Sequence, residues 1–159
     1  MPIHEHAAKH PDRPAVIMAT SGETVTYREL DDRSNRLAQL FRARGIGSGG
    51  HVAILLDNHA RYYEVAWAAQ RAGLYLTPIN WHLGADEAGY IVKDCGADAL
   101  VTSARFAELI GDMGEAAAGV QTRLSIDGAL PGFESYESAL EGAKPEPIDD
   151  ESEGSWMFY

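Results

Sequence analysis

The sequence predicts an α/β protein with a mostly parallel sheet flanked by helices. Short apolar runs alternate with segments of helical periodicity, and this alternation is typical of βαβ units with right-handed crossovers. Residues 51–56 are apolar on both faces, as expected of a parallel strand that is covered on both sides. Glycines follow several of the periodic segments, at positions where helices commonly end. Together these three observations predict the fold class.

The N-terminal part is expected to form a hairpin followed by a long helix. Residues 15–19 and 24–26 are short strand-like runs separated by a turn. Thr26 and Glu29 have the spacing of a capping box, in which the hydroxyl and the carboxylate each bind a backbone N–H group. The helix that follows is amphipathic and is expected to stop at Gly45.

The later elements follow from the same signals. We expect strands at 51–56, 74–80, 99–102 and 123–126, and helices at 62–72, 86–93 and 106–118. The glycine-rich run 45–50 follows a helix and precedes a strand. A phosphate cradle needs the reverse order, so we interpret this run as a connecting loop.

Composition restricts the class of protein. A chain of 159 residues fits one globular unit. Its net charge is −11, and it has no basic run that could neutralise nucleic-acid phosphates, so we expect no nucleic-acid partner. It has no apolar run of the roughly 20 residues that a membrane span needs and no secretion signal. A single cysteine excludes an internal disulfide, and a cytoplasmic location is expected.

The composition of the last part of the chain differs from that of the rest, because acidic residues and prolines become frequent. We expect an N-terminal α/β subdomain at 1–128, an acidic, proline-containing and solvated excursion at 129–155, and a strand at 156–159. The final four residues are apolar and uncharged, which is typical of a strand meant for a sheet interior. We therefore expect this chain to be the front part of a larger protein and to leave apolar surface exposed here.

Few residues qualify as candidates for chemistry. The sequence has no nucleophile elbow, Walker loop, Cys-x-x-Cys or His-Glu-x-x-His motif. His4, His6 and His10 are interpreted as surface histidines on a mobile arm, not as metal ligands. Cys95 is interpreted as a small buried side chain.

Aromatic residues and one further histidine remain. The aromatic residues are interpreted as core or subunit-contact residues in preference to a ligand pocket, and they are Tyr62, Tyr63, Trp67 and Tyr75. His82 follows the carboxyl end of a predicted strand, where open α/β sheets place their ligands. This location makes His82 the main candidate for a functional residue.

Several segments resemble the core motifs of the adenylate-forming superfamily, which covers acyl-CoA synthetases, non-ribosomal adenylation domains and luciferases. In chain order they are 26–30 (TYREL) with 34–38 (SNRLA), 72–80 (AGLYLTPIN), Glu87 with Tyr90, Ile91 and 94–97 (DCGA), and 156–159 (WMFY). Each motif alone is weak, but their shared order and spacing extend the resemblance over nearly the whole chain. The last of them looks like the strand that enters the ATP-phosphate loop of that family.

The resemblance implies an activity for a longer enzyme. Such an enzyme activates a carboxylic acid, here a fatty or related acid, with Mg²⁺ and ATP to an acyl-adenylate, and then passes the acyl group to a thiol, commonly that of CoA. The phosphate loop, the metal-binding acid and the catalytic lysine of the family lie downstream of residue 159. The resemblance therefore implies no catalytic residue and no metal ligand in this chain, no bound cofactor, and no activity of the chain alone.

One residue carries a specific implication. Residues 80–83 (NWHL) resemble the Asn-x-Arg-Leu pattern of the acyl-CoA synthetase branch, whose arginine meets a phosphate of CoA in some relatives. His82 stands in the place of that arginine. Imidazole is shorter than guanidinium and is charged only when protonated, so a weaker contact is implied.

Two alternatives remain beside the acyl-CoA synthetase. One is an adenylation domain that loads a carrier protein, which shares the same motifs over this region. The other is a non-catalytic α/β binding module. The expected partners are a small carboxylic acid and the remainder of the same chain, and a homo-oligomer is possible.

Overall fold

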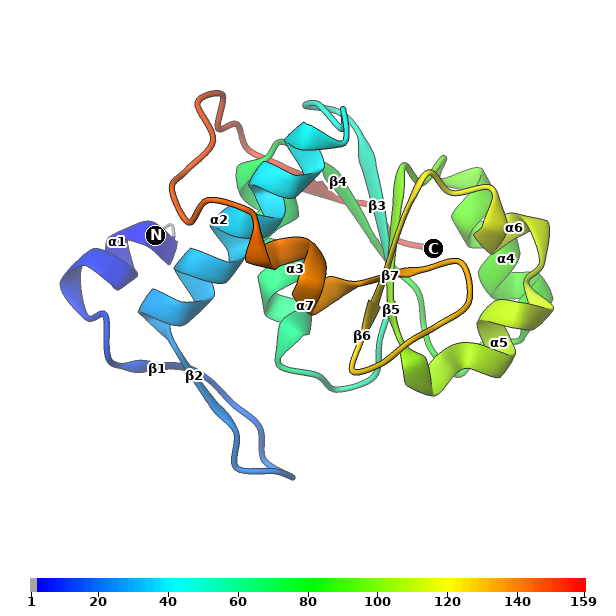
Figure 1. Cartoon of the computed structure of the whole chain (residues 1–159), viewed down its shortest axis with the longest axis horizontal. Coiled ribbons are helices and arrows are strands. Elements are labelled where there is room, and N and C mark those ends of the chain that lie inside the picture. Colours follow the sequence, from blue (N-terminus) through cyan, green and yellow to red (C-terminus); the bar gives the residue numbers. More distant parts are fainter. Residues whose placement is uncertain (1–2) are drawn as a thin grey trace.

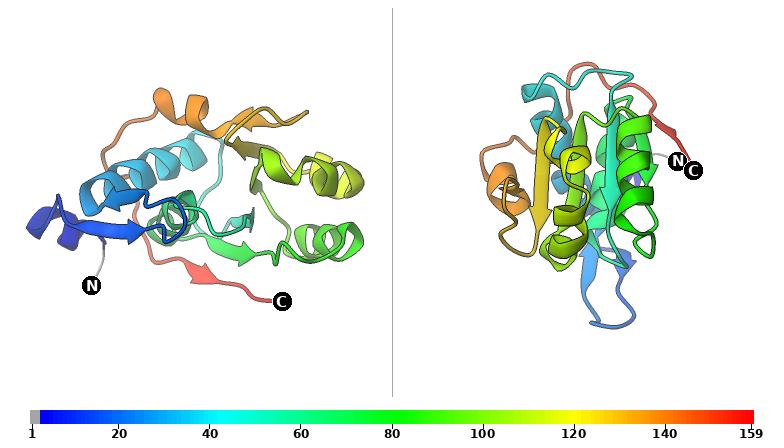
Figure 2. Two further views of the ribbon diagram at one scale, coloured as in Figure 1. Left: turned by 90° about the horizontal axis from the view of Figure 1, so that it is seen from below. Right: turned by 90° about the vertical axis from the view of Figure 1, so that its right-hand side faces the viewer.

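A parallel sheet divides the structure into three layers (Figures 1 and 2). The computed structural model describes residues 3–159. Its six-stranded sheet has the order β7-β6-β5-β3-β4-β8, and every neighbouring pair is parallel. The strands are β3 (His51–Leu55), β4 (Tyr75–Pro78), β5 (Ala99–Ser103), β6 (Thr122–Ile126), β7 (Glu134–Ser135) and β8 (Ser155–Trp156). The predicted fold class is confirmed.

Helices cover both faces of the sheet, as Figure 1 shows. On one face lie α2 (Tyr27–Ala43), α3 (Arg61–Arg71) and α7 (Tyr136–Glu141), and on the other lie α4 (Ala85–Asp94), α5 (Ala107–Asp112) and α6 (Glu115–Ala118). The central strand β3 sends alternate side chains into the two cores: Ile54 joins the first core, and Leu55 joins the second. Burial of such side chains contributes roughly 1.5–3 kcal/mol each, so both helical layers are needed to stabilise the sheet.

A hairpin and a short helix complete the N-terminal part. The strands β1 (Pro14–Ile17) and β2 (Thr24–Thr26) pair antiparallel, as predicted, and α1 (Ile3–Lys9) packs beside them. Helix α2 begins with the predicted capping box, in which Thr26 N–H donates to Glu29 (2.8 Å) and Glu29 N–H donates to the Thr26 hydroxyl (3.3 Å). The Thr26 backbone N–H and the Thr26 hydroxyl (2.9 Å) both donate to the Glu29 carboxylate, and these hydrogen bonds lower the pKa of Glu29.

The expectation that the N-terminal arm is mobile is wrong for the residues that the structure describes. Residues from Ile3 onward form α1, and the Ile3 side chain is buried among apolar residues of the hairpin and α2. The ring of His6 stacks on Tyr27 at a centroid distance of 5.0 Å. A single buried isoleucine and one stacked ring are tertiary contacts, so the sequence pattern did not reveal them.

The helix expected at 106–118 is broken into three pieces. A 3-10 turn, η1 (Ala104–Phe106), precedes α5, and Gly114 then separates α5 from α6. Gly114 has a φ of 53°, a conformation that glycine adopts without steric cost. The chain therefore turns at this point, so that Ile110 and Ala116 both face the second core.

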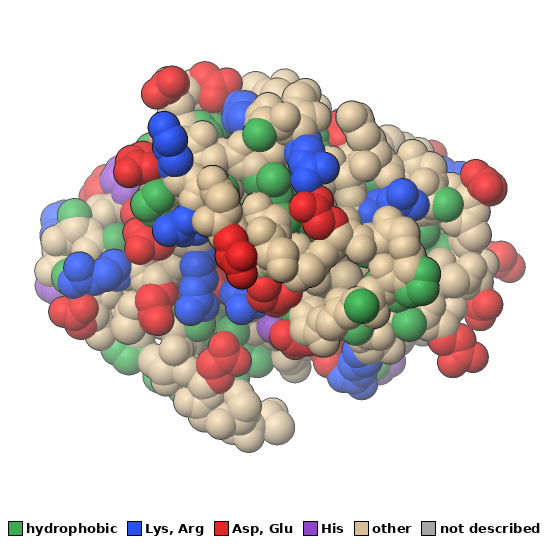
Figure 3. Space-filling model, viewed as in Figure 1, with side chains coloured by type: hydrophobic (Ala, Val, Ile, Leu, Met, Phe, Trp, Pro, Cys, Tyr) green, Lys and Arg blue, Asp and Glu red, His purple; other side chains and the backbone are tan. Residues whose placement is uncertain are grey.

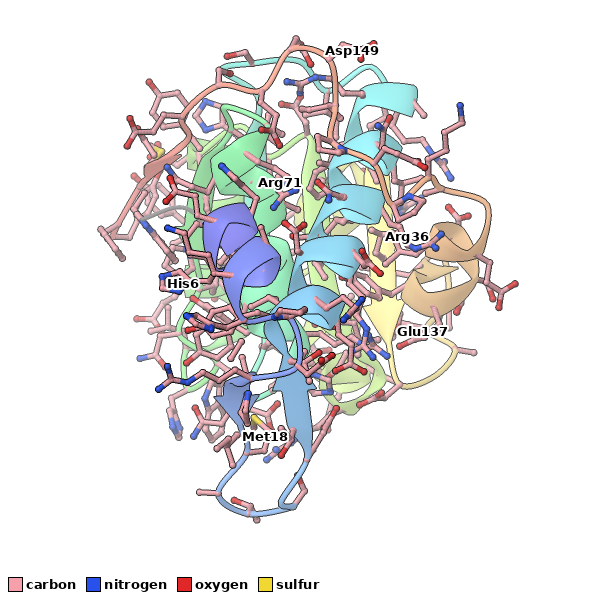
Figure 4. All side chains as sticks on the ribbon, turned by 90° about the vertical axis from the view of Figure 1, so that its left-hand side faces the viewer. His6, Met18, Arg36, Arg71, Glu137 and Asp149 are labelled. Atoms are coloured by element: carbon pink, nitrogen blue, oxygen red, sulfur yellow. The ribbon has the colours of Figure 1, made fainter. Side chains whose placement is uncertain are left out.

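The segment expected as a solvated excursion is partly buried. It contains β7 and α7, and the Tyr136 and Ile148 side chains lie in the first core. The stretch from 142 to 154 crosses α2, where Arg36 donates to the carbonyl of Ala143 and Arg42 Nε donates to Asp150 (2.9 Å). Figure 4 shows Arg36 reaching toward the turn that follows α7, and in Figure 3 acidic and basic side chains alternate over this face.

The C-terminal strand lies at an edge of the sheet, not in its interior. Only Ser155 and Trp156 are in β8, which pairs with β4 alone among the described residues. Trp156 and Phe158 are 47% and 73% exposed, so exposed apolar surface is present here as expected. Gly154 brings β8 close, because an added Cβ would lie 2.6 Å from the carbonyl oxygens of Ala69 and Leu74. The Tyr159 hydroxyl bonds Asp94 (2.7 Å), which raises the pKa of Tyr159 to about 12.

No helix among residues 3–159 combines the length and the apolar character needed to cross a bilayer.

A buried carboxylate ties three helices together. The Glu64 side chain on α3 is fully buried and accepts from Arg33 of α2 (3.1 Å), from Arg61 (3.2 Å) and from the Tyr136 hydroxyl of α7 (3.1 Å). A buried charge is tolerated when ion pairs and hydrogen bonds compensate for its lost hydration. Burial raises the pKa of Tyr136 well above its ordinary range, and the Glu64 carboxylate adds to the rise.

We expect Tyr136→Phe to lower the free energy of unfolding by about 1.5–3 kcal/mol, because it removes a hydrogen bond to a buried charge. Chemical denaturation at neutral pH measures this change. Tyr63→Phe is the matched control, since it removes a half-exposed hydroxyl from α3 and should cost less than about 0.5 kcal/mol. Equal effects of the two substitutions would show that α7 does not depend on Glu64.

The raised pKa of Tyr136 also predicts a pH dependence. The folded protein holds this phenolic proton more tightly than the unfolded chain does. Stability is therefore complete below the ordinary tyrosine pKa of about 10 and decreases as the pH rises above it. Comparing the pH dependence of the unfolding free energy in wild type and Tyr136→Phe isolates this contribution. A variant that loses stability above pH 10 as steeply as wild type would contradict the assignment.

Candidate functional site

The carboxyl ends of the central strands form the candidate site. The chain leaves β3 toward α3 on one face of the sheet, but it leaves β4 and β5 toward α4 and α5 on the other face. Because β3 lies between β4 and β5, the direction of the connections reverses at this point. Open α/β sheets bind ligands in the crevice that such a reversal creates.

Three side chains from three different strand ends meet at this edge. Asp57 follows β3, Trp81 follows β4, and Arg105 follows β5. The Arg105 guanidinium bonds the Asp57 carboxylate through Nη1, and its Cζ atom lies 5.4 Å from the centre of the Trp81 ring. Such a distance allows a cation–π interaction. The strand order therefore creates a charged and aromatic cluster from residues that are far apart in the sequence.

His82 lies at the surface beside this cluster. Its ring centre is 3.6 Å from that of Trp81, and its backbone N–H donates to Asn80 Oδ1 (3.0 Å), which fixes the turn after β4. Trp81 is half-buried against the second core and holds this turn on the sheet. The structure thus places His82 after the carboxyl end of β4, at the point that the sequence predicts.

A second pair joins the ends of β3 and β6. His59 Nδ1 accepts from the backbone N–H of Arg61 (3.1 Å), so the neutral ring carries its proton on Nε2 and donates it to Asp127 (2.8 Å). Asp127 has a φ of 59°, a left-handed conformation that aspartate tolerates better than most residues. This pair fixes the loop before α3 and thereby the position of Asp57 in the same loop.

Sequence reasoning found His82 but missed Asp57 and Arg105. Both stand within three residues of the end of a strand that the sequence predicts, so their positions along the chain were a usable signal. The order of the strands across the sheet was missing. Without that order, nothing places the ends of β3 and β5 next to each other.

A groove lies between α3 and residues 151–156. This groove of about 830 Å³ is bordered by aromatic and acidic side chains, including Tyr62, Tyr63, Trp67, Glu151, Glu153 and Trp156. Tyr62 and Trp67 pack against hydrophobic cores, as the sequence predicts, and they also line this groove. Tyr63 lines the groove and is half-exposed. Tyr75 lies outside it and stacks on His51. Arg71, the last residue of α3 and labelled in Figure 4, pairs with Asp31 of α2 (2.6 Å) and lies 3.7 Å from Glu151.

The other candidates carry no ligand geometry. Cys95 is buried, as predicted, and burial raises the pKa of its thiol. Within residues 3–159, no three histidine, cysteine or acidic side chains gather into a group that could hold a metal. At the carboxyl edge, a guanidinium, an imidazole and an indole ring lie side by side. This combination suits binding of a planar ligand that carries negative charge.

Comparison with known proteins identifies relatives over the whole of this fold. Residues 3–158 match the family model described as AMP-binding enzyme. The chain is 35% identical over 108 residues to the fatty acid–[acyl-carrier-protein] ligase ScoC of Streptomyces coeruleorubidus, covering 68% of this chain. It is 36% identical over 96 residues to a feruloyl-CoA synthase of an Amycolatopsis species, covering 60% of this chain. In both cases the chain spans only 20% of the relative's length.

The fold recurs in solved structures. A fatty acyl CoA synthetase of Mycobacterium tuberculosis superposes with a TM-score of 0.84 at 23% sequence identity. The superposition covers 99% of this chain and 31% of that one. This likeness supports the architecture, including the order of the parallel strands.

Proposed function

The chain belongs to the AMP-binding enzyme family, and we propose that it is the N-terminal segment of an acid–thiol ligase that uses ATP. The longer enzyme joins a carboxylic acid to AMP and then transfers the acyl group to CoA. The observation that carries this proposal is the family match over residues 3–158, with relatives that include a feruloyl-CoA synthase. A fatty or related acid is the proposed substrate, and the cytoplasm is the proposed location.

Within this proposal, the chain is a scaffold that also contributes to the acceptor site. We assign no residue of this chain to ATP or Mg²⁺, and we place His82 at the phosphate end of CoA. Its surface position beyond β4, beside an indole ring, supports this placement. A phosphate at this point would meet an imidazole, which forms an ion pair with it only when the ring is protonated.

The groove beside α3 has a structural role in the same proposal. Tyr63 and Trp156 are about half-exposed along it, which is unfavourable for large aromatic side chains. We propose that the remainder of the longer polypeptide packs over this groove and over the free edge of β8. Edge strands with exposed apolar side chains are usually covered in native proteins.

A carrier protein is the second candidate acceptor. The 35% identity to an acyl-carrier-protein ligase favours it, and such a ligase differs from a CoA ligase in the molecule that carries the accepting thiol. Both acceptors present the same phosphopantetheine thiol. CoA also carries a 3′-phosphorylated nucleotide, so a contact to that phosphate separates the two candidates.

We expect the 159-residue chain alone to give no carboxylate-dependent ATP–pyrophosphate exchange, because it has no group assigned to the transferring phosphates. The polypeptide extended by the region that its longer relatives carry should give exchange with a suitable acid and then form a thioester. A preparation of the extended polypeptide with an inactivated phosphate loop controls for contaminants. Exchange by the chain alone that persists through further purification contradicts the assignment of a scaffold role.

Substituting His82 tests the acceptor. In the extended enzyme, we expect His82→Arg to lower the KM for CoA by about tenfold, which is the effect of one added charge-assisted hydrogen bond. Exchange should stay unchanged, because it does not involve CoA. His10→Arg adds the same charge at an exposed position after α1 and serves as the control. If His82→Arg impairs exchange and leaves the KM for CoA unaltered, the placement of His82 is wrong.

A further inference from the structure

A permanent cation lies beside the same Trp81 ring that His82 contacts. Arg105 comes from the end of β5, and its guanidinium lies 5.4 Å from the centre of the same indole ring that contacts His82. Its side chain is 61% exposed. An arginine is charged at every physiological pH, and its planar fork of N–H groups matches phosphate oxygens. The edge therefore holds the fixed charge that position 82 lacks.

The Asp57 carboxylate forms an ion pair with the Arg105 guanidinium. Among residues 3–159, Asp57 is the hydrogen-bond partner of the Arg105 guanidinium, and it uses one of the two terminal nitrogens. The other N–H groups face solvent or the indole ring, because the side chain is mostly exposed. A phosphate that approaches Arg105 thus gains hydrogen bonds from these groups but is repelled by the neighbouring carboxylate.

We propose that Arg105, supported by Trp81, binds the phosphate of a nucleotide at this edge, and that Asp57 weakens this binding. The inference rests on the proposed acceptor site and adds the residue that determines its specificity. The Trp81 ring already contacts the His82 ring and the Arg105 guanidinium, so its role is to position these two side chains. Arg105 then distinguishes a phosphorylated nucleoside from one without phosphate.

The alternative is that Asp57 and Arg105 form only a structural ion pair. An exposed ion pair contributes little to stability, with a median of about 0–1 kcal/mol. The two readings predict different outcomes. In a purely structural pair, loss of either partner has a similar small effect on stability and no effect on binding. In a phosphate site, loss of Arg105 and loss of Asp57 have opposite effects on affinity.

Calorimetric titration of the 159-residue chain with adenosine 3′,5′-bisphosphate tests the inference. We expect Arg105→Gln to weaken binding by about tenfold and Asp57→Asn to strengthen it by about threefold or more, as expected for one charged hydrogen bond and one removed repulsion. Arg105→Lys should retain part of the affinity, since it keeps the charge but loses the fork. Arg44→Gln removes another exposed arginine, which pairs with Glu134, and should leave binding unchanged.

Titrations with further ligands identify which phosphate of the nucleotide Arg105 binds. AMP carries only the 5′-phosphate and adenosine carries none, so stronger binding of the bisphosphate than of AMP indicates the 3′-phosphate of a CoA-like acceptor. Equal binding of adenosine and the bisphosphate would overturn the inference. So would an Arg105→Gln variant that binds as wild type does. If Arg105→Gln has no effect but His82→Arg strengthens binding of the bisphosphate, the proposed acceptor site stands without Arg105. If neither wild type nor His82→Arg binds the bisphosphate, the inference and the CoA assignment both fail.

Discussion

The complete burial of residues 52–55 of β3 is the constraint on which the rest of the structure depends. Val52, Ala53, Ile54 and Leu55 have no exposed surface, although successive side chains of a strand point to opposite faces. Both faces of the sheet must therefore be covered by helices. The chain satisfies this requirement by sending its connections to one face after β3 and to the other after β4 and β5. The candidate edge is a direct consequence, because open α/β sheets commonly bind ligands where the connections reverse.

Charged residues serve two different purposes in this fold. Glu64 is fully buried and joins α2, α3 and α7, so its role is structural. Asp57 and Arg105 also form an ion pair, but the arginine is mostly exposed at the carboxyl edge. Solvent screens such a pair, and its contribution to stability is small. An exposed pair of this kind is therefore free to serve binding, whereas the Glu64 cluster cannot change its partners without loss of stability.

The acidic segment after β6 positions the last strand. Side chains of α2 hold this segment in one path along the helix. Arg36, Gln39 and Arg42 bind the backbone or the carboxylates of residues 143–150. Gly154 then allows close contact with α3 and β4. These contacts set the register of β8, in which Leu76 pairs with Trp156. In the proposed ligase, this strand leads toward the phosphate loop, so the segment is a positioning element more than a linker.

Local signals in the sequence determined most of the secondary structure. The capping box at Thr26 and the stop at Gly45 depend on neighbouring residues, and both were predicted correctly. The doubly apolar strand was predicted at 51–56 and is observed at His51–Leu55. His82 was found for the same reason, because its position after a strand is a local property. The break at Gly114 was missed, since an isolated glycine is also tolerated within a helix.

Only the tertiary structure decided which distant residues meet. Asp57 and Arg105 are 48 positions apart, and Glu64 and Tyr136 are 72 positions apart. Helical and strand periodicities specify which side of an element is apolar, but they do not specify the order of strands in a sheet. Packing of the whole chain fixes that order. The sequence by itself therefore determined the fold class and one residue of the candidate site, whereas the strand order assembled the remainder of the site.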